Sequence, residues 1–212
     1  LPAFGVLGQH LIQPIGLQLK RVVFVVLRGQ RHEDGVPISH EVEILGETFP
    51  GKYDMVFTSH GVLSWLSDLT LWAKQIAACL VSGGSLYLSE GHPLLHAISD
   101  QAPSERETLC LGYPYLSQKE SMHYDESGSY ADRDRETHAN ETRQWYWSLS
   151  DVVNALINHG FELQWLREHP EGFCQFIPEM EEGSDGHFRL PPPLHGRYPL
   201  TFTVLANKKE TP

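Results

Sequence analysis

Two short polar segments hold the side chains best suited to chemistry, and each directly follows an apolar run. They are Thr58-Ser59-His60-Gly61 and Glu90-Gly91-His92-Pro93. An imidazole titrates near neutral pH, so His92 could take a proton from a reacting group or hold that group in place. A purely structural interpretation stands beside this one, in which Pro93 merely fixes the imidazole within a loop.

The same segments allow a second kind of chemistry. His60, Glu90 and His92 supply two imidazoles and one carboxylate, which form a ligand set for iron(II) or zinc. A metal-dependent enzyme is therefore one alternative function, although sequence spacing does not show that the three side chains reach one ion. Our leading interpretation assigns no metal, and elemental analysis would separate the two.

A strand–helix–strand unit must position both segments. Residues 53–58 and 85–89 are short apolar runs that suit buried strands. Between them, residues 69–80 carry apolar side chains at three- and four-residue steps, which predicts a helix with one buried face. Such crossovers join parallel strands, so both carboxyl ends open on one edge of the sheet, where open α/β proteins bind ligands.

Glycines and small polar residues predict where the helices begin and end. The first helix begins at Ser67 or Asp68, whose side chains can accept its free N–H groups, and it ends at Ser82-Gly83-Gly84. A second helix begins at Ser148-Leu149-Ser150-Asp151, which approximates a capping box, and it ends at Gly160. Further strands are predicted over residues 19–27, 161–166 and 200–206.

A long polar stretch, residues 99–147, has little periodicity but many aromatic side chains. A segment of this length inside a compact domain is typical of a lid or a binding insertion. We expect Tyr130 and Trp145 to bind a small organic substrate there, because aromatic rings with polar tips suit such a site. His138 lies in the same stretch and is a second candidate catalytic residue, beside His92.

Charge and composition exclude several classes of protein. The 212 residues include 16 basic and 27 acidic side chains, for a net charge of −11, which disfavours binding to nucleic acid or to anionic membranes. Three scattered cysteines indicate neither a disulfide framework nor a structural zinc site, so a cytoplasmic location fits best. We see no signal peptide, and because the chain begins at Leu1 we expect a fragment or a trimmed chain.

The order of these segments resembles the class I S-adenosylmethionine-dependent methyltransferases. Residues 53–69 resemble the fourth-strand segment of that family, and residues 80–90 resemble its Leu-x-x-Gly-Gly turn into the fifth strand. Further pieces resemble one bacterial subgroup: residues 90–93, 128–131 with 137–140, and 145–160. The resemblance implies a Rossmann-like α/β fold, with a mostly parallel sheet and an antiparallel last strand.

The family's glycine-rich loop, which follows its first strand, is absent from this chain. Glu33 or Asp34 could imitate the acidic residue that binds the ribose hydroxyls. We therefore divide the chain into an atypical or incomplete N-terminal segment (1–41), a methyltransferase-like domain (42–208) with the insertion at about 99–147, and a tail (209–212). Because the loop lets the backbone approach the donor closely, we expect this chain to bind it weakly or not at all.

The resemblance implies methyl transfer from S-adenosylmethionine to an oxygen or nitrogen of a small molecule. It also implies a set of cofactor-binding residues at the edge of the sheet: Thr58, Ser59, His60, Gly61, Leu63 and Glu90. The other alternative is a degenerate or truncated domain that keeps the fold and acts as a binding module without catalysis. Formation of a homodimer is an option that size-exclusion chromatography would test.

Overall fold

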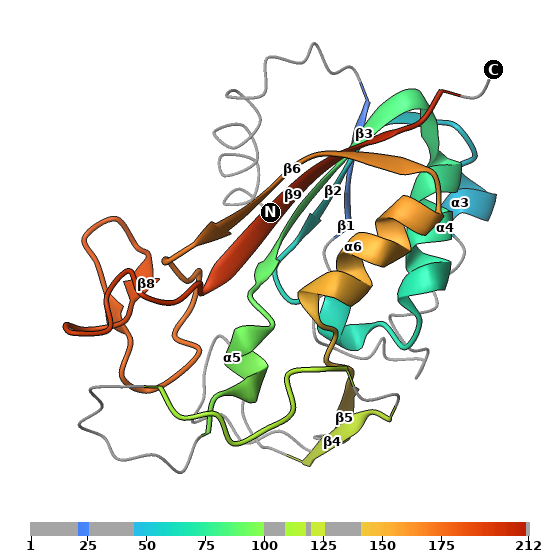
Figure 1. Ribbon diagram of the computed structural model, residues 1–212. Helices are drawn as coiled ribbons and strands as arrows, with labels where there is room; N and C mark the ends of the chain where they lie inside the picture. Colours follow the sequence, from blue (N-terminus) through green and yellow to red (C-terminus); the bar gives the residue numbers. More distant parts are fainter. Residues whose placement is uncertain (1–20, 26–44, 100–108, 118–119, 126–140, 211–212) are drawn as a thin grey trace.

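A five-stranded sheet organises the computed structural model, which describes residues 21–25, 45–99, 109–117, 120–125 and 141–210 (Figure 1). The strand order is β1-β2-β3-β9-β6. The bounds are Val22–Val25 for β1, Tyr53–Ser59 for β2, Leu80–Gly91 for β3, Phe161–His169 for β6 and Thr201–Lys208 for β9. Of the strand predicted at 19–27, only residues 21–25 fall within the described residues.

Strand directions confirm the predicted sheet. β1, β2 and β3 are parallel to one another, whereas β9, the last strand in the chain, runs antiparallel between β3 and β6. The connection from β2 to β3 contains helix α4 (Leu69–Cys79), as a parallel crossover requires. The fold is thus a Rossmann-like α/β sheet, mostly parallel with an antiparallel last strand.

The prediction that Ser82-Gly83-Gly84 ends the first helix is wrong. Helix α4 ends at Cys79, and Leu80 is already extended and opens β3, so Gly83-Gly84 lies inside a strand. The pairing of β2 with β3 shifts between Tyr53 and Met55, and Gly83 has a positive φ of 71° at this irregularity. A glycine in a strand often marks such a bulge, which the same two-glycine pattern does not distinguish from a helix end.

Asp68, and not Ser67, caps α4. Its carboxylate accepts hydrogen bonds from the backbone N–H groups of Thr70 (2.7 Å) and Leu71 (3.1 Å). Replacing Asp68 with alanine is expected to lower the free energy of unfolding by about 1 kcal/mol, because two N–H donors lose their acceptor. Urea unfolding would measure this. Replacing the exposed neighbour Ser67 with alanine should change the free energy of unfolding by less than about 0.5 kcal/mol. Equal effects of the two replacements would refute the assignment of Asp68 as the cap.

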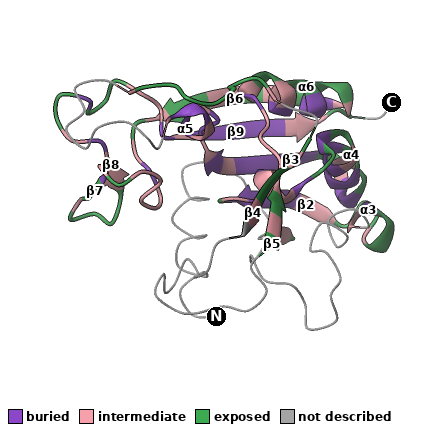
Figure 2. Cartoon of the chain, turned by 90° about the horizontal axis from the view of Figure 1, so that it is seen from below, coloured by how far each residue is buried: buried purple, intermediate pink, exposed green. Residues whose placement is uncertain are grey.

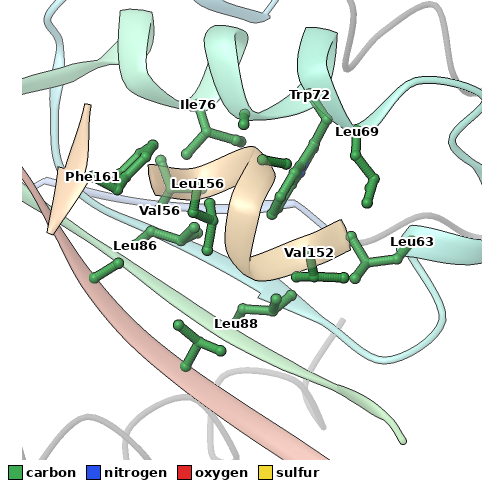
Figure 3. Close-up of a cluster of buried hydrophobic side chains, with 14 of the residues drawn as sticks. Val56, Leu63, Leu69, Trp72, Ile76, Leu86, Leu88, Val152, Leu156 and Phe161 are labelled. Atoms are coloured by element: carbon green, nitrogen blue, oxygen red, sulfur yellow. The ribbon is translucent and has the colours of Figure 1, made fainter. Parts of the chain in front are cut away.

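Helices α4 and α6 cover one face of the sheet (Figure 1). Helix α6 (Leu149–Asn158) begins with the predicted capping box between Ser148 and Asp151. In Figure 3, Trp72 of α4 points between the two helices, toward Val152 and Leu156 of α6. The strand side chains beneath them are Val56, Leu86 and Leu88, which belong to the same buried cluster. Burial of this continuous apolar cluster drives the helices onto the sheet.

The remaining described elements are short. Helix α3 (Leu45–Thr48) packs on α4, the 3-10 turn η2 (Leu63–Trp65) follows β2, and α5 (Leu94–Ala97) follows β3. Two antiparallel ribbons complete the set: β4 (Met122–Asp125) with β5 (Glu141–Gln144), and β7 (Glu181–Glu182) with β8 (Phe188–Arg189).

The strands β3 and β9 are largely buried, whereas no described residue of the β4–β5 and β7–β8 ribbons is buried (Figure 2). No helix within the described ranges is long and apolar enough to cross a membrane.

Candidate functional site

The two polar segments lie side by side, as predicted. In the parallel pairing of β2 with β3, Ser59 stands opposite Ser89, and the backbone N–H of His60 donates to the Ser89 carbonyl at 2.9 Å. α5 follows directly from β3, and the β4–β5 ribbon lies at the same end of the sheet (Figure 1). The carboxyl edge of β2 and β3 therefore brings the two polar segments together.

Glu90 holds the loop that leaves β2. Its Oε1 accepts from the N–H groups of Val62 (2.6 Å) and Leu63 (3.1 Å), and its Oε2 accepts from Gly61 (2.6 Å) and Gly91 (3.2 Å). The side chain is buried, which raises the pKa of Glu90, while the N–H donors act against that rise. The prediction that Glu90 contacts a cofactor directly needs correction, because both of its carboxylate oxygens already accept hydrogen bonds from backbone N–H groups.

His60 turns the chain away from the sheet in a backbone conformation that is uncommon for residues other than glycine. Its φ is +46°, the left-handed region. The ring stacks on Phe173, with centroids 4.0 Å apart, and Nε2 pairs with Ser89 Oγ at 3.2 Å. Desolvation of the ring lowers the pKa of His60, although the residue as a whole is exposed, so the ring is neutral at pH 7.

The other predicted cofactor-binding residues divide between an open and a buried set. Gly61 has a φ of +84°, and no described atom lies within 4 Å of the position that a Cβ would take. Ser59 is almost fully buried at the end of β2. Thr58 is completely buried, and its Oγ1 has no hydrogen-bond partner among the described residues. Leu63 packs in the core, so its side chain stabilises the helices rather than facing a ligand.

His92, predicted as a catalytic base, is engaged at both ring nitrogens. Nδ1 accepts from the Leu94 N–H at 3.1 Å, so Nε2 carries the proton and donates to Glu168 Oε1 at 2.8 Å. Burial lowers the pKa of His92, and the nearby Glu168 partly opposes this. With its lone pair bound and its side chain buried, the ring cannot accept a substrate proton in this arrangement. The catalytic assignment is wrong for the geometry seen here, and His92 joins β3 to β6.

The metal alternative fails on the same contacts. The carboxylate of Glu90 and both ring nitrogens of His92 are already hydrogen-bonded. Within the described part of the chain, no group of three histidine, cysteine, aspartate or glutamate side chains is placed to share an ion. His60, Glu90 and His92 are therefore not a ligand set in this arrangement.

Only part of the predicted lid can be placed. Tyr130 and His138 lie outside the described residues. Trp145 follows β5, and its backbone N–H donates to the Ser64 carbonyl at 2.8 Å. Two residues on, Trp147 Nε1 donates to the Leu66 carbonyl at 3.0 Å. The segment after β5 is thus hydrogen-bonded to η2 and to the residue that follows it, next to the loop that Glu90 holds.

Four residues at this edge were not singled out from the sequence as site residues. Phe173 stacks on His60, Glu168 pairs with His92, and the ring of His96 stacks on Tyr146 at 4.1 Å between centroids. Each contact joins segments far apart in the chain. The aromatic content of residues 99–147 indicated Tyr146, but no local signal identified the other three.

Acidification is expected to weaken the protein through His96. Desolvation lowers the pKa of His96 to about 4, whereas an unfolded histidine titrates near 6.5. The unfolded chain therefore takes up a proton first, and stability that is present above about pH 6.5 is lost as the pH falls toward 4. We expect His96 to account for a loss of about 2 kcal/mol by pH 4.5.

Urea unfolding at pH 7 and 4.5 would measure this loss. His96→Phe, which keeps a ring against Tyr146, should show a smaller pH dependence than the wild type. Replacing the exposed His123 with glutamine serves as the control and should not change the pH dependence of stability. An unchanged pH dependence in His96→Phe would rule out the assignment.

The sequence and the fold of this chain were compared with those of known proteins. No description of a known protein family matches the chain, and no curated protein sequence matches it. Solved structures do resemble it, among them a proposed S-adenosylmethionine-dependent methyltransferase from Listeria monocytogenes (17% identity, TM-score 0.46, 76% of this chain and 63% of that one). An S-adenosylmethionine-dependent methyltransferase from Mesorhizobium loti has 16% identity and a TM-score of 0.46 over 74% of this chain and 62% of that one.

A proposed methyltransferase from Bacillus halodurans covers more: 95% of this chain and 98% of that one, at 12% identity and a TM-score of 0.48. The chain spans less than two thirds of the length of the first two structures. At such identities and TM-scores, we base the functional proposal on the geometry of this chain itself.

Proposed function

We propose that this chain is a methyltransferase that moves a methyl group from S-adenosylmethionine to an oxygen or nitrogen of a small molecule. The observation that carries the proposal is the loop of residues 60–63, fixed by Glu90 at the carboxyl edge of two parallel strands. Ligands of open α/β sheets bind at that edge. The segments that build it are also those that resemble the methyltransferase family in sequence.

The residues present fit such a donor at one place. No described atom fills the space above Gly61, which leaves room for a ligand against the backbone, and Ser59 and His60 directly precede Gly61 in the chain. These residues would hold the donor, whereas Leu63 and Glu90 would shape the loop from beneath. When bound, the donor supplies an activated methyl group, and the chain's own task is to align the acceptor with it and exclude water.

Binding of S-adenosylhomocysteine, the demethylated donor, tests the proposal. We expect a dissociation constant on the order of 0.1–1 mM, or about 4–5.5 kcal/mol of binding free energy, because the chain lacks the family's glycine-rich loop. Of the two outcomes that the missing loop allows, weak binding and no binding, only weak binding fits methyl transfer by this chain. In NMR titrations, the backbone amide signals of residues 58–63 should shift, while those of α6 should not. A folded chain with no shift at saturating ligand would refute methyl transfer and favour a non-catalytic binding module.

Two glycines provide matched variants for this experiment. Gly61→Ala places a methyl group in the open space beside the loop, whereas Gly186→Ala does so in the β7–β8 turn, at a similar φ of +76° and with equally open surroundings. Both changes add similar backbone strain, about 1–2 kcal/mol. We expect Gly61→Ala to weaken binding at least about tenfold, a change of about 1.4 kcal/mol, and Gly186→Ala to leave it unchanged. Equal behaviour of the two variants would contradict this location.

A further inference from the structure

We propose that His60 is the catalytic base that takes the proton from the acceptor's O–H or N–H group; this inference rests on the proposed methyl transfer. The acceptor's lone pair forms a bond to the methyl carbon as the carbon–sulfur bond breaks and its electrons stay on sulfur. The acceptor's proton then moves to a ring nitrogen of His60. Atoms and charge balance, because the positive sulfonium becomes a neutral thioether and the imidazole becomes an imidazolium.

The backbone of His60 supports this assignment. A left-handed φ costs a residue with a Cβ about 1–2 kcal/mol, and such strain persists only where the surroundings enforce it. The surroundings enforce it here, since the N–H of His60 donates to Ser89 and the next three N–H groups bind the carboxylate of Glu90. The effect is that the imidazole leaves the sheet at the edge where the donor would lie.

The ring contacts leave one nitrogen available. Phe173 covers one face of the imidazole, and Nε2 pairs with Ser89 Oγ. Among the described residues, Nδ1 has no hydrogen-bond partner. When Nε2 donates its proton to Ser89, Nδ1 keeps the lone pair that a base needs. The lowered pKa keeps this ring neutral at pH 7.

His92 provides the contrast within the same edge. Its lone pair on Nδ1 is used by the Leu94 N–H, and its side chain is only 6% exposed. Of the two histidines that follow parallel strands, His60 is therefore the one whose contacts leave room for proton transfer.

Carbethoxylation by diethylpyrocarbonate tests the proposal without an identified acceptor, because the reagent attacks an accessible, unprotonated imidazole nitrogen. Peptide mapping at pH 7 should show modification of His60 and none of His92. S-adenosylhomocysteine at four times its dissociation constant should slow the reaction of His60 about fivefold. The exposed His123 and His187 should react at the same rate with and without the ligand.

Ring-nitrogen NMR provides a second readout, because the Nδ1 signal of a purely structural histidine such as His92 should not respond to the ligand. We expect Nδ1 of His60 to be unprotonated at pH 7 and its signal to move when S-adenosylhomocysteine binds. A protonated Nδ1, an unreactive His60 or a lack of protection, in a sample whose residues 58–63 respond to the ligand, would overturn the base assignment and leave methyl transfer standing. Failure of the ligand to bind at all would instead refute the proposed function.

Discussion

Replacing Trp72 with alanine is expected to lower the free energy of unfolding by about 4 kcal/mol, the largest effect of any single change considered for this protein. Trp72 is 1% exposed and fills the space between α4, α6 and the sheet (Figure 3). Alanine would remove the apolar contacts of the indole and leave a cavity that the two helices close only in part. Urea denaturation followed by circular dichroism would measure the loss.

A matched variant separates the packing of Trp72 from its polar atom. The indole Nε1 is buried and has no hydrogen-bond partner among the described residues. Phenylalanine keeps a ring and removes this unsatisfied donor, so Trp72→Phe should cost less than about 1.5 kcal/mol. Lys74→Ala, on the exposed side of the same helix, should change stability by less than about 0.5 kcal/mol. Equal losses for Trp72→Ala and Trp72→Phe would contradict the packing argument.

Replacing Glu90 with alanine is expected to cost about 3 kcal/mol, because the N–H groups of residues 61–63 then lose a buried acceptor. Glutamine has the same shape, but its amide nitrogen would meet N–H donors that an oxygen now accepts. We expect Glu90→Gln to cost about 2 kcal/mol for that reason. Urea unfolding would give both values, with the exposed Glu162→Gln as the control.

Hydrogen exchange would show where the effect of Glu90 lies. The amides of residues 61–63 should exchange at least about tenfold faster in Glu90→Gln, equivalent to about 1.4 kcal/mol of lost local protection, while amides within α4 keep their relative order. If Glu90→Gln matches the wild type in stability and in the protection of these amides, the carboxylate does not hold the loop. Loss of order in this loop would also remove the constraint on His60.

Local patterns were sufficient for most of the sheet and for the start of both main helices. The apolar run at residues 53–58 became β2, the three- and four-residue steps after Asp68 became α4, and the capping box at Ser148 opens α6. These features depend on neighbours within a few residues, which periodicity records directly. Gly83-Gly84 was misplaced because a bulge and a helix end require the same backbone freedom.

The sequence alone established that two parallel strands would bring the His60 and Glu90 segments to one edge, since a helix of that length between two strands allows little else. Only the tertiary structure decided what each side chain does there. His92 is bound by Glu168, 76 residues away, and Glu90 is occupied by backbone N–H groups. A residue's type shows which bonds it can make, but the packing of distant segments determines which of those bonds are already taken.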